Sequence, residues 1–319
     1  GLVGSEMCIR DSYPSGMYLI TVTQLLEFTG LAVAVASGGG PVQAAAGYLA
    51  GRLLGTAFMW VGQRKVSPWL RYGLSHASFG ELRRLIAPAF ASLAFPLGNA
   101  LNIQGMRLVI GMVLGPSAVA LFVPLRTLSR LVMQPAAIIN RLIEPELALA
   151  HGAGNDFLFQ RLFERSCQLA IWGCLGACFL MGPGAYWIFP EWTGGKIPMH
   201  WPAYSLLLSG VLINSVWHTA LMVPYATNRH GRVSVFYTLI YGGGACGLAF
   251  FGTICMGFCG AALSVLFVEV TMAGIVIRES LFLSRMQFHQ WISIVLQPPF
   301  RIVGKAAATL REWVVASYG

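Results

Sequence analysis

A long apolar hairpin that carries three arginines constrains this chain more than any other stretch. The hairpin runs from Leu85 to Arg141 and reverses at Gly115-Pro116-Ser117. At about 1.5 Å of rise per residue, each arm is long enough to cross a hydrocarbon core of about 30 Å. An arginine inside a membrane costs at least about 2.5 kcal/mol, so its side chain normally faces protein, water or an ionic ligand. We therefore expect the hairpin to hold an anion.

The three arginines have a spacing that could bring them to one site. Arg107 lies about two helical turns before the reversal, and Arg126 lies at a similar depth after it. Arg130 follows Arg126 by four residues, on the same helical face and about 6 Å deeper. We expect Arg126 and Arg130 to make the main anion contacts, with Arg107 third. Asn99 and Asn102 in the first arm would extend the polar lining.

The composition indicates an all-α integral membrane protein. Hydrophobic residues make up 56% of the 319 residues and charged residues only 10%, against about 25% charged in an ordinary soluble domain. Glycines within the apolar runs allow close helix packing, and the period-two alternation of an outer-membrane barrel is absent. The net charge of +9 includes no long run of lysine or arginine, so nucleic acid is not an expected partner.

Apolar runs predict about eight transmembrane helices, two followed by six. The predicted ranges are 13–62 for the first two, 63–84 for a basic cytoplasmic loop, 85–278 for six more and 279–319 for a basic tail. Fifteen of the 21 lysines and arginines lie in loops or the tail on one side, and only Lys196 lies in a loop on the other. The positive-inside rule therefore places the C-terminus in the cytoplasm.

Two acids and a histidine fall inside predicted spans and could take part in proton coupling. Glu27 lies in the first span; it could serve a cavity, or it could be neutralised by burial or paired with an arginine. Glu269 is a second acid of this kind, in the last span. His218 shares a helix face with Asn214, where a hydrogen bond between helices is more common than a proton relay.

Glycines in the second span form a stripe. Gly47, Gly51 and Gly55 recur every four residues, with Arg52 beside them. Small residues at this spacing let two helix backbones approach closely, so we expect a packing face. The cysteines of the apolar spans lack nearby histidine or carboxylate partners, so we expect small packing residues and neither a metal nor a cofactor.

A family resemblance is carried by the segment ELRRLIAPAFASLAFPLGNALNIQGMRLVIGMVLGPSAVALFVPLRTLSRLV, followed by a loop and two further pairs of spans. This pattern resembles the second lobe of bacterial polysaccharide (oligosaccharide-lipid) flippases of the Wzx type, within the multidrug/oligosaccharidyl-lipid/polysaccharide exporter superfamily. The resemblance implies two six-helix lobes around a cationic cavity. On that comparison, 13–62 corresponds to the last two helices of the first lobe and 85–278 to a complete second lobe.

The start of the chain fits an N-terminally truncated fragment of such a protein. Residues 1–12 match neither a signal peptide nor a helix, and they resemble translated sequencing adapter rather than native sequence. The first four helices that the resemblance implies would precede this chain.

The resemblance implies a transporter rather than an enzyme. Its substrate would be an undecaprenyl-diphosphate-linked oligosaccharide, the repeat unit of surface polysaccharides such as exopolysaccharide or the O-antigen of lipopolysaccharide. The arginines would attract the diphosphate while two lobes alternate access across the bacterial cytoplasmic (inner) membrane. Besides the lipid bilayer, the polysaccharide polymerase machinery would be a partner.

Two other functions remain open at this point. A multidrug exporter of the same superfamily should favour acids in its cavity, whereas the deep charges of the hairpin are cationic. A membrane-embedded glycosyltransferase or acyltransferase would need a carboxylate pair or a His/Asp site at the membrane face. The only cluster of that kind consists of Glu144, Glu146, His151 and Asp156. A solvated loop explains this cluster better.

Overall fold

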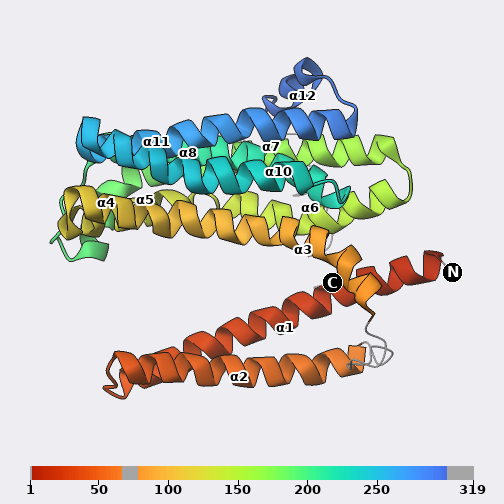
Figure 1. Cartoon of the computed structure of the whole chain (residues 1–319), viewed down its shortest axis with the longest axis horizontal. Coiled ribbons are helices and arrows are strands. Elements are labelled where there is room, and N and C mark those ends of the chain that lie inside the picture. The colour runs from red at the N-terminus through yellow and green to blue at the C-terminus, as the bar shows by residue number, and fades with distance from the viewer. Residues whose placement is uncertain (1, 67–77, 300–319) are drawn as a thin grey trace, which may run out of the picture. The chain divides into compact units, whose positions relative to one another are not determined.

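The computed structural model describes residues 2–66 and 78–299, and every regular element in these ranges is a helix (Figure 1). The chain divides into two compact units, one ending at Leu82 and the other beginning at Arg83. Of the loop expected at 63–84, residues 67–77 lie outside the described residues.

The first unit is a pair of long helices, α1 (Leu2–Ala36) and α2 (Pro41–Val66). Because α1 begins at Leu2, the expectation that residues 1–12 do not form a helix is wrong. Extending an existing helix costs far less than starting one, so a long apolar helix can continue through a sequence with weak helical signals.

The glycine stripe of α2 packs against α1, as predicted. A Cβ atom on Gly47 would collide with the backbone oxygen of Gly30, and one on Gly51 would collide with the backbone oxygen of Leu26. A Cβ on Gly55 would lie 2.6 Å from a methyl carbon of Thr23. The two backbones therefore approach more closely than any other residue would allow.

The arginine hairpin forms the start of the second unit. Its helices are α3 (Phe79–Ala100), the π-helical segment η1 (Leu101–Gly105), α4 (Met106–Leu114), α5 (Pro116–Leu131) and α6 (Gln134–Gly152). The reversal occurs at Gly115, whose φ of 88° suits glycine, and Pro116 begins the next helix. The second arm is not one straight span, because α5 and α6 meet at 52°. Pro135 in the first turn of α6 cannot donate a backbone hydrogen bond, which fits a bend at this point.

The remaining helices complete the unit. They are α7 (Asp156–Thr193), α8 (Trp201–Ala220), α9 (Met222–Ala226), α10 (Gly231–Phe236), the π-helical segment η2 (Tyr237–Gly244), α11 (Ala245–Ser284) and α12 (Phe288–Val295). Gly257 interrupts α11 with non-helical φ and ψ of 58° and −136°. A Cβ on Gly260 would collide with the backbone of Gly252, so the chain folds back on itself here (Figure 1).

Five helices among the described residues are long and apolar enough to cross a membrane, or six if the bent pair α5–α6 is one span. This is fewer than the eight predicted, for two reasons. The stretch Gly231–Ser284 counts as one candidate span, although Gly257 divides it into two antiparallel helices. In addition, α2 is not among the candidates, because Arg52 and many small residues make it less apolar.

The predicted basic tail, 279–319, is partly helical. Helix α11 continues to Ser284, and the short helix α12 follows at Phe288–Val295. Side chains of α7 hold this helix: Gln168 donates to the backbone oxygen of Gln297 and Trp172 to that of Val295. Residues 300–319 lie outside the described residues.

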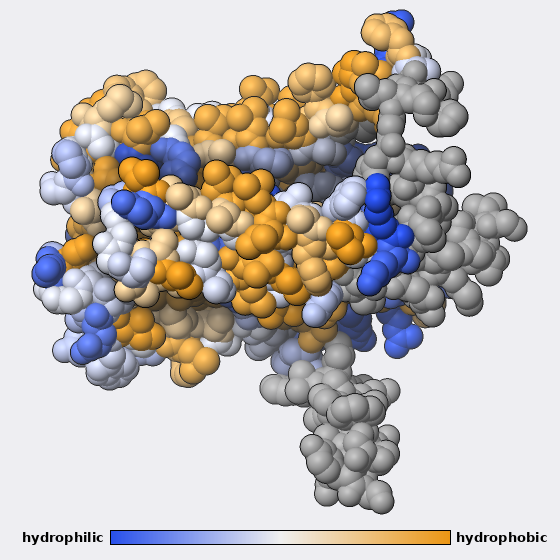
Figure 2. All heavy atoms as spheres, turned by 90° about the horizontal axis from the view of Figure 1, so that it is seen from below, coloured by the Kyte–Doolittle hydropathy of each residue, from blue (hydrophilic) through white to orange (hydrophobic). Residues whose placement is uncertain are grey.

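Large apolar side chains are exposed over much of the surface. Figure 2 shows hydrophobic areas on this face, interspersed with residues of intermediate hydropathy and with hydrophilic ones. On α7, Phe179 is 82% exposed and Leu180 is 71% exposed. Apolar patches of this extent are unusual on soluble monomers and suit contact with lipid. Helix length, hydropathy and surface together support a multi-pass membrane protein.

Candidate functional site

The three candidate arginines line one cavity of the second unit. This space, here called the arginine cavity, has a volume of about 480 Å³ and lies among residues of η1, α4, α5, α6 and α8. Arg107 reaches it from α4, and Arg126 and Arg130 reach it from α5. The turn at Gly115 and the four-residue spacing on α5 thus bring the side chains of both arms together.

Arg126 is buried and hydrogen-bonded to the polypeptide itself. Its Nη1 donates to the backbone oxygen of Asn102 at 3.0 Å, and its Nη2 donates to the side-chain oxygen of the same residue. Asn102 in turn donates through Nδ2 to the backbone oxygen of Tyr241 at 2.8 Å. These bonds join α5 to both π-helical segments. They also explain why Asn102 is fully buried and lines neither the arginine cavity nor the neighbouring cavity described below.

Arg130 and Arg107 are less buried than Arg126, and no carboxylate pairs with either among the described residues. The side chain of Arg130 is exposed and makes no hydrogen bond or ion pair within the part of the chain that the structure describes. Arg107 donates to Gln104 Oε1 at 2.9 Å. A cation within an apolar helical unit normally has a partner or faces water or a ligand. The cavity therefore presents two positive charges that a ligand can reach.

Glu269 is close to this site but is held by neutral donors. Its Oε2 accepts hydrogen bonds from Asn214 Nδ2 at 2.8 Å and from Trp217 Nε1 at 2.9 Å. It lines a small cavity of about 30 Å³ together with Arg126 and Arg130. That volume has room for about two water molecules. Glu269 thus lies beside Arg126 and Arg130 without an ion pair to either of them.

His218 connects α8 to α6. Its Nδ1 lies 3.1 Å from Nδ2 of Asn140, so a hydrogen bond between helices is present, as the sequence suggested. Asn214, the expected neighbour on the same face, bonds to Glu269 instead. His218 also lines the arginine cavity and a second cavity of about 420 Å³ beside it. Asn99 lines that second cavity rather than the first.

Glu27 belongs to the first unit and pairs there with an arginine. Its Oε1 lies 2.7 Å from Nη1 of Arg52, and its Oε2 accepts a hydrogen bond from the hydroxyl of Tyr48 at 2.8 Å. Both partners are in α2. Of the alternatives open for this carboxylate, the structure shows the ion pair.

Sequence reasoning missed the aromatic lining of the second cavity. Phe95, Tyr225, Tyr237 and Tyr241 all contribute to it. The available signal was weak: Tyr237 and Tyr241 are four residues apart in an apolar stretch, next to a run of three glycines. Such a pair usually means packing. No group of histidine, cysteine, aspartate and glutamate that could hold a metal occurs among the described residues.

Comparisons with protein-family models, with curated proteins and with solved structures find no match to this chain.

Proposed function

We propose that this chain forms part of a transporter that moves an undecaprenyl-diphosphate-linked oligosaccharide across the bacterial cytoplasmic membrane. The single observation that carries the proposal is the arginine cavity, where Arg107 and Arg130 have no carboxylate partner among the described residues. A diphosphate is a suitable ligand, because a guanidinium can donate two parallel hydrogen bonds to neighbouring phosphate oxygens.

The mechanism that follows is alternating access by two lobes. In this proposal the helices from α3 to α11 are a complete second lobe of six spans, and α1 and α2 are the last two of a first lobe. The diphosphate and sugars enter the cationic cavity while the undecaprenyl chain stays in lipid. Rocking of the lobes then exposes the cavity to the other side of the membrane.

Three irregular points close to the cavity would serve such a motion. They are the π-helical segments η1 and η2 and the bend between α5 and α6. Segments of this kind are frequent at functional sites and at kinks, because their hydrogen-bond ladders are already interrupted. The segment η1 and the bend contribute Ile103, Met133 and Gln134 to the arginine cavity, and η2 is bonded to η1 through Tyr241 and Asn102.

An exporter of cationic drugs fits the site less well. Its cavity should offer free carboxylates, whereas Glu269 already accepts hydrogen bonds from Asn214 and Trp217. The side chains of Arg107 and Arg130 would repel a cationic compound. The balance of accessible charge therefore favours an anionic substrate.

A binding experiment tests the proposal on the purified chain. In detergent micelles, native mass spectrometry would compare undecaprenyl diphosphate with undecaprenol, which has the same chain and no phosphate. We expect selective binding of the diphosphate, with Arg130→Ala and Arg107→Ala each weakening it about tenfold, as loss of a hydrogen bond to a charged group would. Arg130→Lys should keep part of the affinity, because lysine retains the positive charge but cannot donate the two parallel hydrogen bonds of a guanidinium.

Lys196→Ala is the matched control, since it removes a positive charge from a loop outside the cavity. Equal binding of the two lipids, or unchanged affinity in both cavity variants, would contradict the proposal.

A further inference from the structure

The second cavity adjoins the arginine cavity. It has a volume of about 420 Å³, and Arg130, Met133 and His218 line both spaces. Arg130 thus stands at their junction. A ligand bound to Arg130 from the first cavity could extend directly into the second.

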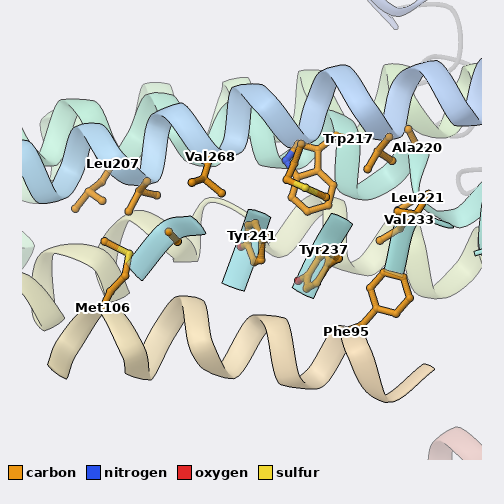
Figure 3. Packing of buried hydrophobic residues seen from close by; sticks show 14 of the residues in the cluster. Phe95, Met106, Leu207, Trp217, Ala220, Leu221, Val233, Tyr237, Tyr241 and Val268 are labelled. Atoms are coloured by element: carbon orange, nitrogen blue, oxygen red, sulfur yellow. The ribbon is translucent and has the colours of Figure 1, made fainter. Parts of the chain in front are cut away.

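Aromatic rings form a continuous row along one side of this second space, here called the aromatic cavity. The ring of Phe95 lies 4.9 Å from that of Tyr225 and 5.0 Å from that of Tyr237, centre to centre. Tyr237 and Tyr241 are 4.6 Å apart. Figure 3 shows Tyr237 and Tyr241 one turn apart on the same segment, with Phe95 from α3 continuing the row. The row presents an apolar surface to a ligand in the aromatic cavity.

The same cavity offers polar groups that lack partners. Tyr237 is only 5% exposed, yet neither its hydroxyl nor that of Tyr225 has a hydrogen-bond partner within the described ranges. The amide of Asn99, one helical turn after Phe95 in α3, is likewise without one there. Buried tyrosine hydroxyls normally find a partner. These groups are therefore available to hydrogen-bond water or a ligand in the cavity.

The chemistry of the lining selects a neutral, hydroxylated ligand. A tyrosine hydroxyl both donates and accepts, and an asparagine side chain offers two donors and an acceptor, as sugar hydroxyls require. The aromatic row matches the less polar face of a sugar ring, and much of the remaining lining is polar. Apart from Arg130 at the junction, no lysine, arginine, aspartate or glutamate of the described ranges lines this cavity.

We propose that the aromatic cavity is a sugar subsite that binds the first sugar of the lipid-linked oligosaccharide, while Arg130 holds the diphosphate. This inference rests on the proposed function and adds the place where the sugar is recognised. In such a lipid the first sugar is bonded directly to the diphosphate, so two adjoining cavities that share one arginine match the order of the groups.

The test measures what the sugar adds to binding. Native mass spectrometry of the purified chain would compare undecaprenyl diphosphate with the same lipid carrying one N-acetylglucosamine. We expect the wild-type chain to bind the sugar-bearing lipid about tenfold more tightly, as one or two added hydrogen bonds would give. Tyr237→Phe and Asn99→Ala should remove most of this difference and leave the affinity for undecaprenyl diphosphate unchanged.

Tyr186→Phe is the control, because Tyr186 is an exposed tyrosine on α7 outside both cavities. Thermal unfolding of each variant separates lost binding from lost folding, and Asn99 is the more exposed position if Tyr237→Phe does not fold. Equal binding of both lipids by the wild type would contradict the sugar subsite but not the arginine site. The same conclusion would follow if both variants kept the higher affinity for the sugar-bearing lipid. Failure to prefer the diphosphate over undecaprenol overturns the proposed function instead.

Discussion

Arg126 donates to both oxygens of Asn102, one in the backbone and one in the side chain, across the two arms of the hairpin. Asn102 lies in η1, where the wider π turn disturbs the regular ladder of backbone hydrogen bonds. The Arg126 guanidinium donates a hydrogen bond to the backbone carbonyl oxygen of Asn102, which belongs to this disturbed ladder. Since Asn102 also donates to Tyr241, the arginine supports both π-helical segments at once. Its first role is therefore structural, although it also lines the arginine cavity.

Arg126→Ala should destabilise the chain, whereas Arg130→Ala should not. Removing the guanidinium of Arg126 leaves two buried oxygens of Asn102 without their donors, at about 1–3 kcal/mol for each unsatisfied group. Arg130 has no such bonds to lose among the described residues. Thermal unfolding of the purified variants, followed by circular dichroism, would measure the difference. Equal melting temperatures would show that these bonds do not stabilise the fold.

The hairpin illustrates what the sequence could predict. The turn at Gly115 and the helical period were enough to place Arg107, Arg126 and Arg130 around one cavity. The different state of each arginine was not predictable, because the partner of Arg126 is a backbone carbonyl in a π-helical segment. Nothing in the side chains of LNIQG signals that irregular turn.

The ion pair between Glu27 and Arg52 predicts that a second substitution can restore the stability that a first one removes. Arg52→Ala should destabilise the chain because Glu27, which is 4% exposed, would keep its charge with only the Tyr48 hydroxyl as donor. The loss should be smaller than that from breaking a fully buried pair, because the Arg52 side chain is 60% exposed. Adding Glu27→Gln should recover most of the stability, since the buried charge is then removed. Thermal unfolding of both single variants and the double variant gives the coupling, and strictly additive losses would refute it.

The close contact between α1 and α2 predicts a position-specific effect of added methyl groups. Gly51→Ala should lower stability strongly, because its Cβ would collide with the backbone of Leu26, which can yield only if the two helices shift apart. Gly16→Ala is the control, since a Cβ there meets nothing within 4 Å. The same unfolding measurement applies. An unchanged melting temperature in Gly51→Ala would mean that the two helices are not packed in this way.

The aromatic cavity marks the limit of sequence reasoning for the candidate site. Tyr237 and Tyr241 share a helical face, which the four-residue spacing does reveal. Their neighbour Phe95 comes from a helix far earlier in the chain, and a single sequence does not show that the two segments meet. Tyrosines in an apolar run are ordinarily packing residues, so the unpartnered hydroxyl of Tyr237 becomes visible only with the cavity around it.

Loop positions give a test of membrane orientation. In Figure 1 the connection between α6 and α7 and the one between α9 and α10 lie at one end of the second unit, and the turns after α4 and α7 lie at the other. This alternation agrees with the positive-inside assignment, in which Gly154 and Arg229 face the cytoplasm and Lys196 does not.

Single cysteines at these three positions, in a variant whose own cysteines are replaced, should react differently with a membrane-impermeant thiol reagent applied to intact cells. We expect Lys196→Cys to be labelled, and Gly154→Cys and Arg229→Cys to react only after the membrane is permeabilised. Arg71, a fourth position of interest on the cytoplasmic side, lies outside the described residues. Labelling of Gly154→Cys and Arg229→Cys but not Lys196→Cys would invert the orientation, and labelling of all three in intact cells would contradict a spanning arrangement of the intervening helices.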